Sequence, residues 1–238
     1  MHWCLGIRGS GSTWVFNAVR KVALVLAPDR PILERYIVRH AELPALYDIA
    51  HVVIVKSHET DADAAADLSE HACAIWISIR DPRDCIASLM QYHNLTFDDA
   101  LRDVEQDARF CGRHSTHSRA HVLRYEANFI DEPATLDRIA SSFGGTLTAA
   151  DRARIFAETR RRAIEAFIEQ LDKLPTAVRP DPNDLVDTVT QWHNHHANRT
   201  GEIGRWRHTL TQPQAAIIEL HLGDWMNAFG YPAELVFG

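Results

Sequence analysis

Short apolar runs alternate along the chain with longer and more polar segments. Four of these runs are expected to form buried parallel strands: 2–7, 51–56, 74–79 and 121–124. Helices are expected over 12–27, 60–71, 133–143, 148–173 and 212–229, and a further helix is expected to start at Asp81–Pro82. Strands that alternate with helices predict an α/β fold, with a doubly wound, mostly parallel central sheet and helices on both faces.

Prolines mark the predicted connections. Pro28, Pro31 and Pro44 interrupt a polar connection that contains some helix, and 175–182 is predicted to be a loop. The chain of 238 residues shows no repeat, low-complexity tract or linker. We therefore expect residues 1–238 to form a single domain.

A glycine-rich segment, Gly6-Ile-Arg-Gly-Ser-Gly-Ser-Thr13, joins the first predicted strand to the first predicted helix. In that context the backbone N–H groups and the helix N-terminus point at one anion, which predicts a P-loop-type phosphate site. A tight turn without a ligand is the alternative. Ser12 stands where a Walker A loop needs its lysine, and Arg80 follows a strand where an aspartate for magnesium would be expected. Both features favour a nucleotide site without that metal.

Lys56 and His58 lie where the 51–56 strand ends, at the sheet edge where ligands bind in open α/β folds. A histidine there can act as a general base, and a lysine can neutralise charge on a transferred group. A hydrogen-bonded surface histidine is the alternative for His58.

Arg80 and Ser88 flank the start of the next helix at the same edge. An ion pair with Asp81 or Asp84 is the alternative for Arg80. Its place beside the glycine loop favours a phosphate partner instead.

Taken together, five separated blocks resemble sulfotransferases that use 3′-phosphoadenosine 5′-phosphosulfate (PAPS). The blocks are Gly6–Trp14, Lys56-Ser-His58, Arg80-Asp-Pro-Arg-Asp with Ser88, Leu123-Arg-Tyr-Glu126, and Arg199-Thr-Gly-Glu-Ile-Gly-Arg-Trp206. They occur in the family's order over nearly the whole chain, and the final Trp225 and Gly230-Tyr231 are similar to the family's end. The resemblance implies a P-loop sulfotransferase that moves a sulfuryl group from PAPS to a hydroxyl or amine and leaves adenosine 3′,5′-bisphosphate (PAP).

The resemblance also implies roles for single residues. His58 would take the proton from the acceptor, and Lys56 would contact the sulfuryl group. Trp14 would stack on the adenine, with Tyr125 beside it. The 5′-phosphosulfate would be held by the backbone and hydroxyls of Ser10, Gly11, Ser12 and Thr13. The 3′-phosphate would be bound by Arg80, Ser88, Arg199 and Gly201, with Thr200 adjacent.

One departure lies in the glycine loop, where the family usually carries a lysine directly before Ser10. This sequence has Gly9 there, preceded by Arg8. Three alternatives are open: Arg8 reaches the same phosphate oxygens, Lys56 takes a larger share, or the chain turns over slowly or only binds the nucleotide. Gly9 and Arg8 are counted with the cofactor-binding residues, and Arg8 also with the catalytic ones.

A net charge of −7 disfavours a general nucleic-acid partner. The four cysteines form no CxxC pair, and neither a signal peptide nor an apolar run long enough to span a bilayer is found. A cytoplasmic protein without a membrane partner is expected, and either a monomer or a homodimer is compatible with the sequence.

Two histidine clusters raise the question of a metal site. They are His114, His117 and His121, and His193, His195 and His196. In the sequence no carboxylate or cysteine completes either set, so no metal is expected. The second cluster shortly precedes Arg199, which predicts a position at the rim of the cofactor site.

The acceptor is expected to be a small molecule, although no motif identifies it. The segments expected to contact it are 30–50, 59–70, 92–118 and 160–198. Within the last, Arg160–Arg162 is either a solvated helix face or a contact for an anionic acceptor. An ATP-dependent P-loop kinase and a non-catalytic binder of PAP are the alternative functions.

Overall fold

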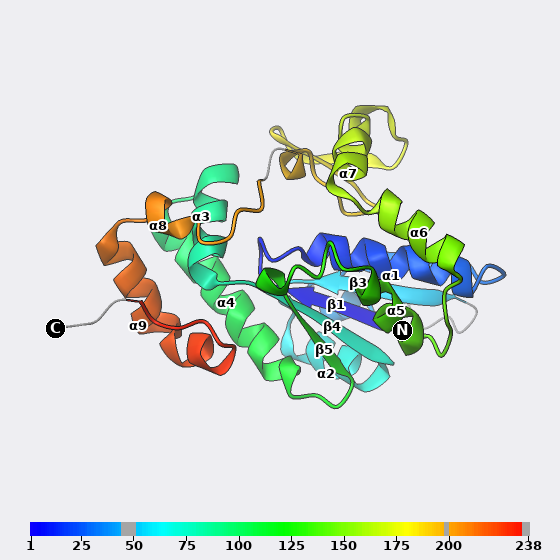
Figure 1. Ribbon diagram of the computed structural model, residues 1–238, viewed down its shortest axis with the longest axis horizontal. Coiled ribbons are helices and arrows are strands. Elements are labelled where there is room, and N and C mark those ends of the chain that lie inside the picture. The colour runs from blue at the N-terminus through cyan, green and yellow to red at the C-terminus, as the bar shows by residue number, and fades with distance from the viewer. Residues whose placement is uncertain (44–50, 198–199, 235–238) are drawn as a thin grey trace.

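The computed structural model describes residues 1–43, 51–197 and 200–234. Its main sheet has five parallel strands in the order β2-β3-β1-β4-β5 (Figure 1). The strands are β1 (His2–Gly6), β2 (Ile32–Tyr36), β3 (Val52–Ser57), β4 (Ala74–Ile79) and β5 (Ala120–Arg124). The predicted α/β fold with a parallel central sheet is confirmed.

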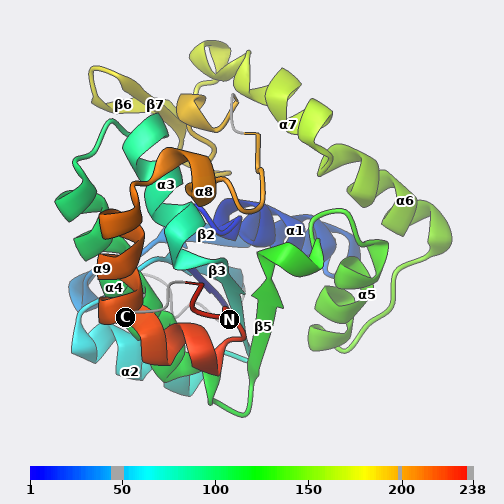
Figure 2. The ribbon, with the colours of Figure 1, turned by 60° about the vertical axis from the view of Figure 1, so that its left-hand side comes forward.

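Helices cover both faces of this sheet (Figures 1 and 2). One face packs against α1 (Ser12–Leu26), α5 (Pro133–Ser142) and α6 (Ala149–Glu158). The other packs against α2 (Ala62–His71), α3 (Pro82–Tyr92), α4 (Phe97–Ser115) and α9 (Gln212–Ala228). The chain also forms α7 (Arg161–Ile168), α8 (Trp206–Thr209) and a hairpin of β6 (Ala177–Asp181) and β7 (Asp184–Asp187).

Strand β1 contributes to both halves of the core. Trp3 and Leu5 pack on the α2 and α4 side, whereas Cys4 packs on the α1 side. Successive strand residues point to opposite faces, so a sheet with helices on both sides needs apolar residues at every position. This requirement explains why the central strands could be recognised as unbroken apolar runs.

Three sequence predictions are wrong in detail. The connection after Pro28 contains the edge strand β2, whose Glu34 and Arg35 concealed it. The segment predicted as a loop at 175–182 contains β6, which pairs only with β7. The helix predicted over 148–173 is divided at Thr159, where α6 ends before α7 begins.

The carboxyl ends of β1, β3 and β4 meet at one edge of the sheet. Leu5 pairs with Ser57, and Gly6 pairs with Ser78. Strands β2 and β3 lie on one side of β1, and β4 and β5 lie on the other. The chain connections therefore run in opposite directions from β1, which creates a crevice at this edge. Among the described residues, no helix has the length and apolar composition needed to cross a membrane.

Candidate active site

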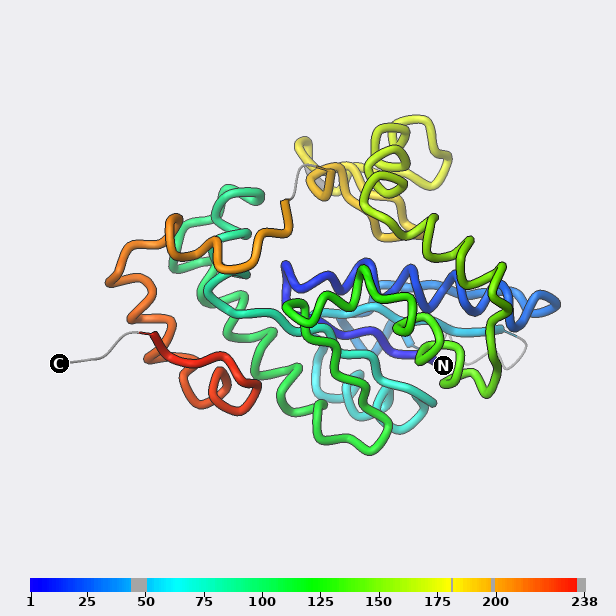
Figure 3. Tube along the Cα trace, in the orientation of Figure 1, coloured from blue at the N-terminus to red at the C-terminus, as the bar shows by residue number. Residues whose placement is uncertain are grey.

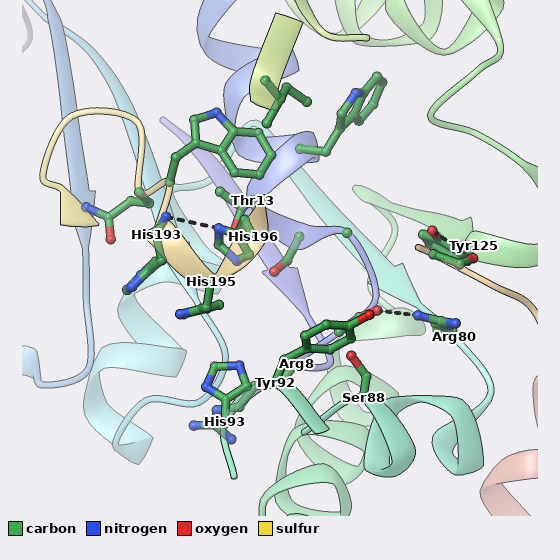
Figure 4. A pocket seen from close by; sticks show the side chains of 18 of the residues that line it. Arg8, Thr13, Arg80, Ser88, Tyr92, His93, Tyr125, His193, His195 and His196 are labelled. Carbon is green, nitrogen blue, oxygen red and sulfur yellow. Dashed lines mark hydrogen bonds between the residues drawn. The ribbon is translucent and has the colours of Figure 1, made fainter. Parts of the chain in front are cut away.

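A cavity of about 1310 Å³ opens at this edge of the sheet. Its volume exceeds the roughly 300–1,000 Å³ of a typical single-ligand site, so the cavity has room for more than one small molecule. Figure 4 shows His193, His195 and His196 on one side of it and Arg80 and Tyr125 on the other.

Most of the predicted site residues line this cavity. They are Arg8, Gly9, Gly11, Ser12, Thr13, Trp14, Lys56, His58, Arg80, Ser88, Tyr125, Thr200 and Gly201. Ser10 does not line it, and Arg199 lies outside the described residues. Five blocks spread along the chain are therefore brought to one place.

The glycine loop leaves the N-terminus of α1 open to a ligand. Gly9 and Gly11 have φ angles of +88° and +87°, a region that residues with a Cβ rarely adopt. No side chain caps α1, and its first turn carries no acidic residue. At Gly6 a Cβ would overlap the Ser78 hydroxyl and Ser12. The loop thus presents an uncapped helix end, which favours an anion.

Ser10 has a structural position instead of the predicted ligand contact. Its hydroxyl donates to the Ser78 carbonyl at 2.9 Å, and the two hydroxyls are 2.8 Å apart. Its backbone N–H donates to the Ile7 carbonyl at 3.0 Å. Because both groups are used within the fold, the expectation that the Ser10 hydroxyl faces the phosphosulfate is wrong.

His58 is oriented by the end of β1. Its Nδ1 lies 2.6 Å from the Gly6 carbonyl oxygen, which can only accept, so Nδ1 carries the proton and Nε2 the lone pair. The side chain is 14% exposed. Burial, together with the positive charges of Lys56 and Arg8, holds the pKa of His58 well below its usual 6.5. His58 is therefore neutral at pH 7 and can accept a proton.

Lys56 enters the cavity from the end of β3. The residue is 3% exposed, and its Nζ lies 5.6 Å from the centre of the Tyr36 ring. Tyr36 pairs with Lys56 in the sheet register, so the edge strand β2 supplies this neighbour. Tyr36 also lines the cavity, although β2 was not predicted.

Arg8 is engaged by a carboxylate within the protein. Its Nη1 lies 2.8 Å from Asp107 Oδ1, and its backbone N–H donates to Oδ2 at 2.8 Å. Asp107 is fully buried, and burial raises its pKa to about 7, although Arg8 acts in the opposite direction. The sequence carried one signal for Asp107, which stands on the apolar face of α4 beside Val104, Ala108 and Cys111.

Arg80 spans the gap between the glycine loop and the segment after residue 199. Its guanidinium stacks on Tyr125 at 4.5 Å, and Nη1 donates to the Gly9 carbonyl at 3.2 Å. Nη2 donates to the Glu202 carbonyl and lies 3.4 Å from Asp84. Its buried Nε has no hydrogen-bond partner among the described residues. Arg80 is thus a largely buried cation at the cavity wall, which suits an anionic ligand.

The segment of residues 200–206 lies beside α3 (Figure 3), and Asp84 of that helix holds it there. Its carboxylate accepts from the backbone N–H groups of Gly204, at 2.7 Å, and Trp206, at 3.0 Å. The adjacent Arg83 is buried and pairs with Asp81 and Glu219. The Arg80–Asp84 block thus brings Thr200 and Gly201 to the cavity although they follow it by more than a hundred residues.

The two aromatic residues predicted near the adenine form part of the wall. The Trp14 ring is almost fully buried, its Nε1 donates to the Thr159 carbonyl at 2.9 Å, and it lies edge-on to Phe129. The Tyr125 hydroxyl donates to the Gly201 carbonyl at 3.2 Å. Both rings line the cavity: Trp14 from α1, which follows β1, and Tyr125 from the residue after β5.

The far end of the cavity is formed by the hairpin and the second histidine cluster. The inference that no carboxylate accompanies this cluster is wrong, because folding brings Asp184 beside His193 and His195. The first cluster is not brought together: His114 packs on Trp3 and His121 on Trp76, which belong to opposite faces of the sheet.

Of the segments expected at the acceptor, three contribute. Tyr36, His93 and several residues between Arg161 and His196 line the cavity. No residue of 59–70 does so, because α2 packs Ala64 and Leu68 into the core beneath the sheet. Arg161 lines the cavity, so the Arg160–Arg162 run is not wholly a solvated face.

Comparisons with known proteins identify the fold. No protein-family model and no curated protein matches the sequence. The structure is similar to mouse sulfotransferase SULT7A1 complexed with PAP, with a TM-score of 0.69, 16% identity, and coverage of 95% of this chain and 84% of that one.

Two structures of retinol dehydratase are also similar. One is a complex with androsterone and the inactive cofactor PAP, with a TM-score of 0.63, 14% identity, and coverage of 99% of this chain and 82% of that one. The other is a complex with retinol and PAP, with a TM-score of 0.61, 15% identity, and coverage of 100% and 83%. The chain therefore has the sulfotransferase fold.

Proposed function

We propose that the chain transfers a sulfuryl group from PAPS to a hydroxyl or amine of a small molecule. The observation that carries the proposal is the buried His58, which is tied to Gly6 through Nδ1 and lines one cavity with Lys56 and an uncapped, glycine-rich helix start. The fold shared with proteins crystallised with PAP supports the choice of donor. We further propose that residues 1–238 act as one domain.

In the proposed step, His58 Nε2 accepts the proton of the acceptor hydroxyl or amine while the acceptor atom forms its bond to sulfur. The bond between sulfur and the 5′-phosphate oxygen breaks, and PAP leaves. Lys56 stabilises charge on the sulfuryl group, and the N–H groups of Ser12 and Thr13 at the start of α1 receive the phosphate. These residues supply positioning and charge, so the transfer itself needs no metal.

The 3′-phosphate is assigned to Arg80, whose buried Nε lacks a partner within the described chain, and to Ser88, Thr200 and Gly201 around it. Arg199 belongs to this assignment by its place in the sequence. Trp14 and Tyr125 form the adenine wall. Three alternatives exist for the loop lysine that is missing at Gly9. Because Arg8 is paired with Asp107, we favour the one in which Lys56 is the principal cation.

The acceptor is assigned to the end of the cavity formed by Tyr36, His93 and the segment from Asn183 to His196. This end combines two aromatic rings, Tyr36 and Trp192, with many hydrogen-bonding side chains. A ring compound that carries hydroxyl or amine groups matches this lining better than an entirely apolar molecule.

The test compares wild type with His58→Ala. Conversion of PAPS to PAP is measured with a panel of hydroxyl- and amine-bearing small molecules, and with water alone as the acceptor. We expect His58→Ala to lose roughly 10²-fold or more in transfer rate while its affinity for PAP is retained. His71→Ala, in the distant helix α2, serves as the matched control.

A His58→Ala variant with the wild-type rate would contradict the proposed base. PAP binding without any turnover would favour the second candidate, a non-catalytic binder, which the neutralised charge of Arg8 supports. Magnesium-dependent consumption of ATP would favour the kinase alternative. Ser12 in place of the Walker A lysine, and Arg80 in place of an aspartate for magnesium, disfavour that alternative.

A further inference from the structure

The acceptor end of the cavity brings together three side chains of the kind that bind metal ions. Asp184, His193 and His195 each offer one ligand atom, and these atoms all lie within 4.8 Å of one another. His193 Nδ1 is 2.8 Å from Asp184 Oδ2, and His195 Nδ1 is 3.3 Å from Oδ1. Two imidazoles thus converge on one carboxylate.

We propose that Asp184, His193 and His195 form a binding site for a divalent transition-metal ion of the Zn²⁺ class. Imidazole nitrogen and carboxylate oxygen are preferred ligands of such ions, and two histidines with one carboxylate are a sufficient protein ligand set. Three protein ligands leave at least one coordination position for a ligand from the cavity. An oxygen of a bound small molecule is the natural occupant of that position.

Backbone contacts hold the three residues in place. Val186 and His193 form an antiparallel bridge, and the Asp187 N–H donates to the Trp192 carbonyl at 3.0 Å. The chain therefore folds back so that His193 faces the start of β7. Because backbone hydrogen bonds already fix this turn, the three side chains lose little conformational freedom when an ion binds.

Asn194 strengthens this arrangement. Its Oδ1 accepts from the N–H groups of Leu185 and His195, at 3.2 and 3.0 Å, and its Nδ2 donates to the Asn183 carbonyl at 3.1 Å. One side chain thus joins both neighbours of Asp184 to the backbone of a histidine ligand. The side chains of the three ligands are only 20–26% exposed, so the site is partly shielded from water.

The site lies in the same cavity as His58 but apart from Arg80 and Tyr125 (Figure 4). The His93 ring, at the end of α3, contacts the His195 ring edge-on at 4.3 Å and closes one side. If the proposed function holds, the ion would face the acceptor and not the nucleotide. Metal binding itself does not depend on that function.

The competing explanation is that Asp184 only accepts hydrogen bonds from two histidines. A metal titration separates the two. The full chain is freed of metal with a chelator and titrated with Co²⁺, whose visible absorption reports nitrogen and oxygen ligands, and Zn²⁺ is then added as a competitor. We expect one equivalent of Co²⁺ to bind and Zn²⁺ to displace it.

Two conservative variants, Asp184→Asn and His193→Gln, are expected to weaken Co²⁺ binding by more than about tenfold, since even outer-shell changes at metal sites cost that much. His71→Ala is the matched control, because His71 contacts a different aspartate, Asp67. Unchanged affinity for PAP, or an unchanged circular dichroism spectrum, shows that each variant is folded. Equal Co²⁺ affinity in wild type and the folded Asp184→Asn, or a wild-type spectrum that does not respond to Co²⁺, would overturn the proposal.

Discussion

At the scale of single residues, the proposed chemistry depends on which nitrogen of His58 holds its proton. The Gly6 carbonyl accepts from Nδ1, so the lone pair of Nε2 is the one available to an acceptor. Gly6 is thus both a residue whose missing Cβ makes room for Ser78 and the residue whose carbonyl selects the tautomer. Burial and nearby cations keep the ring neutral, as a base requires.

The lowered pKa of His58 predicts an unusual pH dependence. A pKa well below 6.5 leaves the base largely unprotonated when the pH falls to 6, so kcat/KM should change little between pH 7.5 and 6.0. A histidine with the ordinary pKa would lose roughly fourfold over this interval. The profile of kcat/KM against pH measures the difference.

Asp107 is the control for that profile, because burial raises its pKa to about 7. An acidic limb near pH 7 that disappears in Asp107→Asn belongs to Asp107. A limb near pH 6.5 that persists in this variant would show that His58 titrates normally.

At the scale of elements, the ion pair between Arg8 and Asp107 joins the glycine loop to α4. The Asp107 carboxylate binds the Arg8 guanidinium and its backbone N–H, so it sets the position of the residue before Gly9. The family's lysine has no equivalent at Gly9, and the nearest loop cation is directed toward a buried carboxylate. In the proposed transfer, the end of β3, with Lys56, is then the element that brings positive charge to the sulfuryl group.

A comparison of variants tests this division of roles. Lys56→Met is expected to lower the transfer rate by roughly 10²-fold, as the loss of one preorganised electrostatic contact does. Arg8→Met combined with Asp107→Asn removes both charges of the pair and should cost less than about tenfold. The double change is used because Arg8→Met alone would leave the buried Asp107 carboxyl without its cationic partner, and a loss of stability could then be mistaken for a loss of catalysis. If the double variant lost more activity than Lys56→Met, Arg8 would be the principal cation.

At the scale of the whole molecule, the proposed nucleotide site is assembled from segments near the two ends of the chain. The glycine loop starts near residue 6, whereas Thr200 and Gly201 follow α7 and the β6–β7 hairpin. Arg80 joins them, because its guanidinium donates to carbonyls on both sides. A ligand that bridges these segments should therefore stabilise the entire fold.

The expected stabilisation can be measured with PAP. At a concentration of 100 times Kd, PAP should raise the free energy of unfolding by about 2.7 kcal/mol, and Tm by roughly 5–11 °C for a protein of this size. Adenosine 5′-monophosphate, which lacks the 3′-phosphate, should give a smaller shift at the same concentration.

Arg80→Met should abolish most of the difference between the two nucleotides, whereas Arg109→Met, on the exposed face of α4, should preserve it. Equal shifts from the two nucleotides in wild type would remove the 3′-phosphate assignment.

Much of this protein could be predicted from local sequence. Central parallel strands are buried on both faces, so β1, β3 and β4 had to be mostly apolar and were recognisable. Residues that directly follow such strands meet at one edge whatever the rest of the fold does, which placed Lys56, His58 and Arg80 beside the glycine loop. The helix start at Asp81–Pro82 was equally local and is confirmed by the Asp81 side chain that accepts from the Arg83 N–H.

Only the tertiary structure decided the remainder. The edge strand β2 needs one buried face and no apolar run, so its polar side chains concealed it. Asp107 reaches Arg8 across 99 residues, and Asp184 reaches two histidines through a hairpin turn. The Ser10 hydroxyl turned to Ser78 because a partner strand supplied acceptors there. Charges and hydrogen bonds between distant segments depend on how helices and hairpins pack, and packing is a property of the folded chain that no local pattern records.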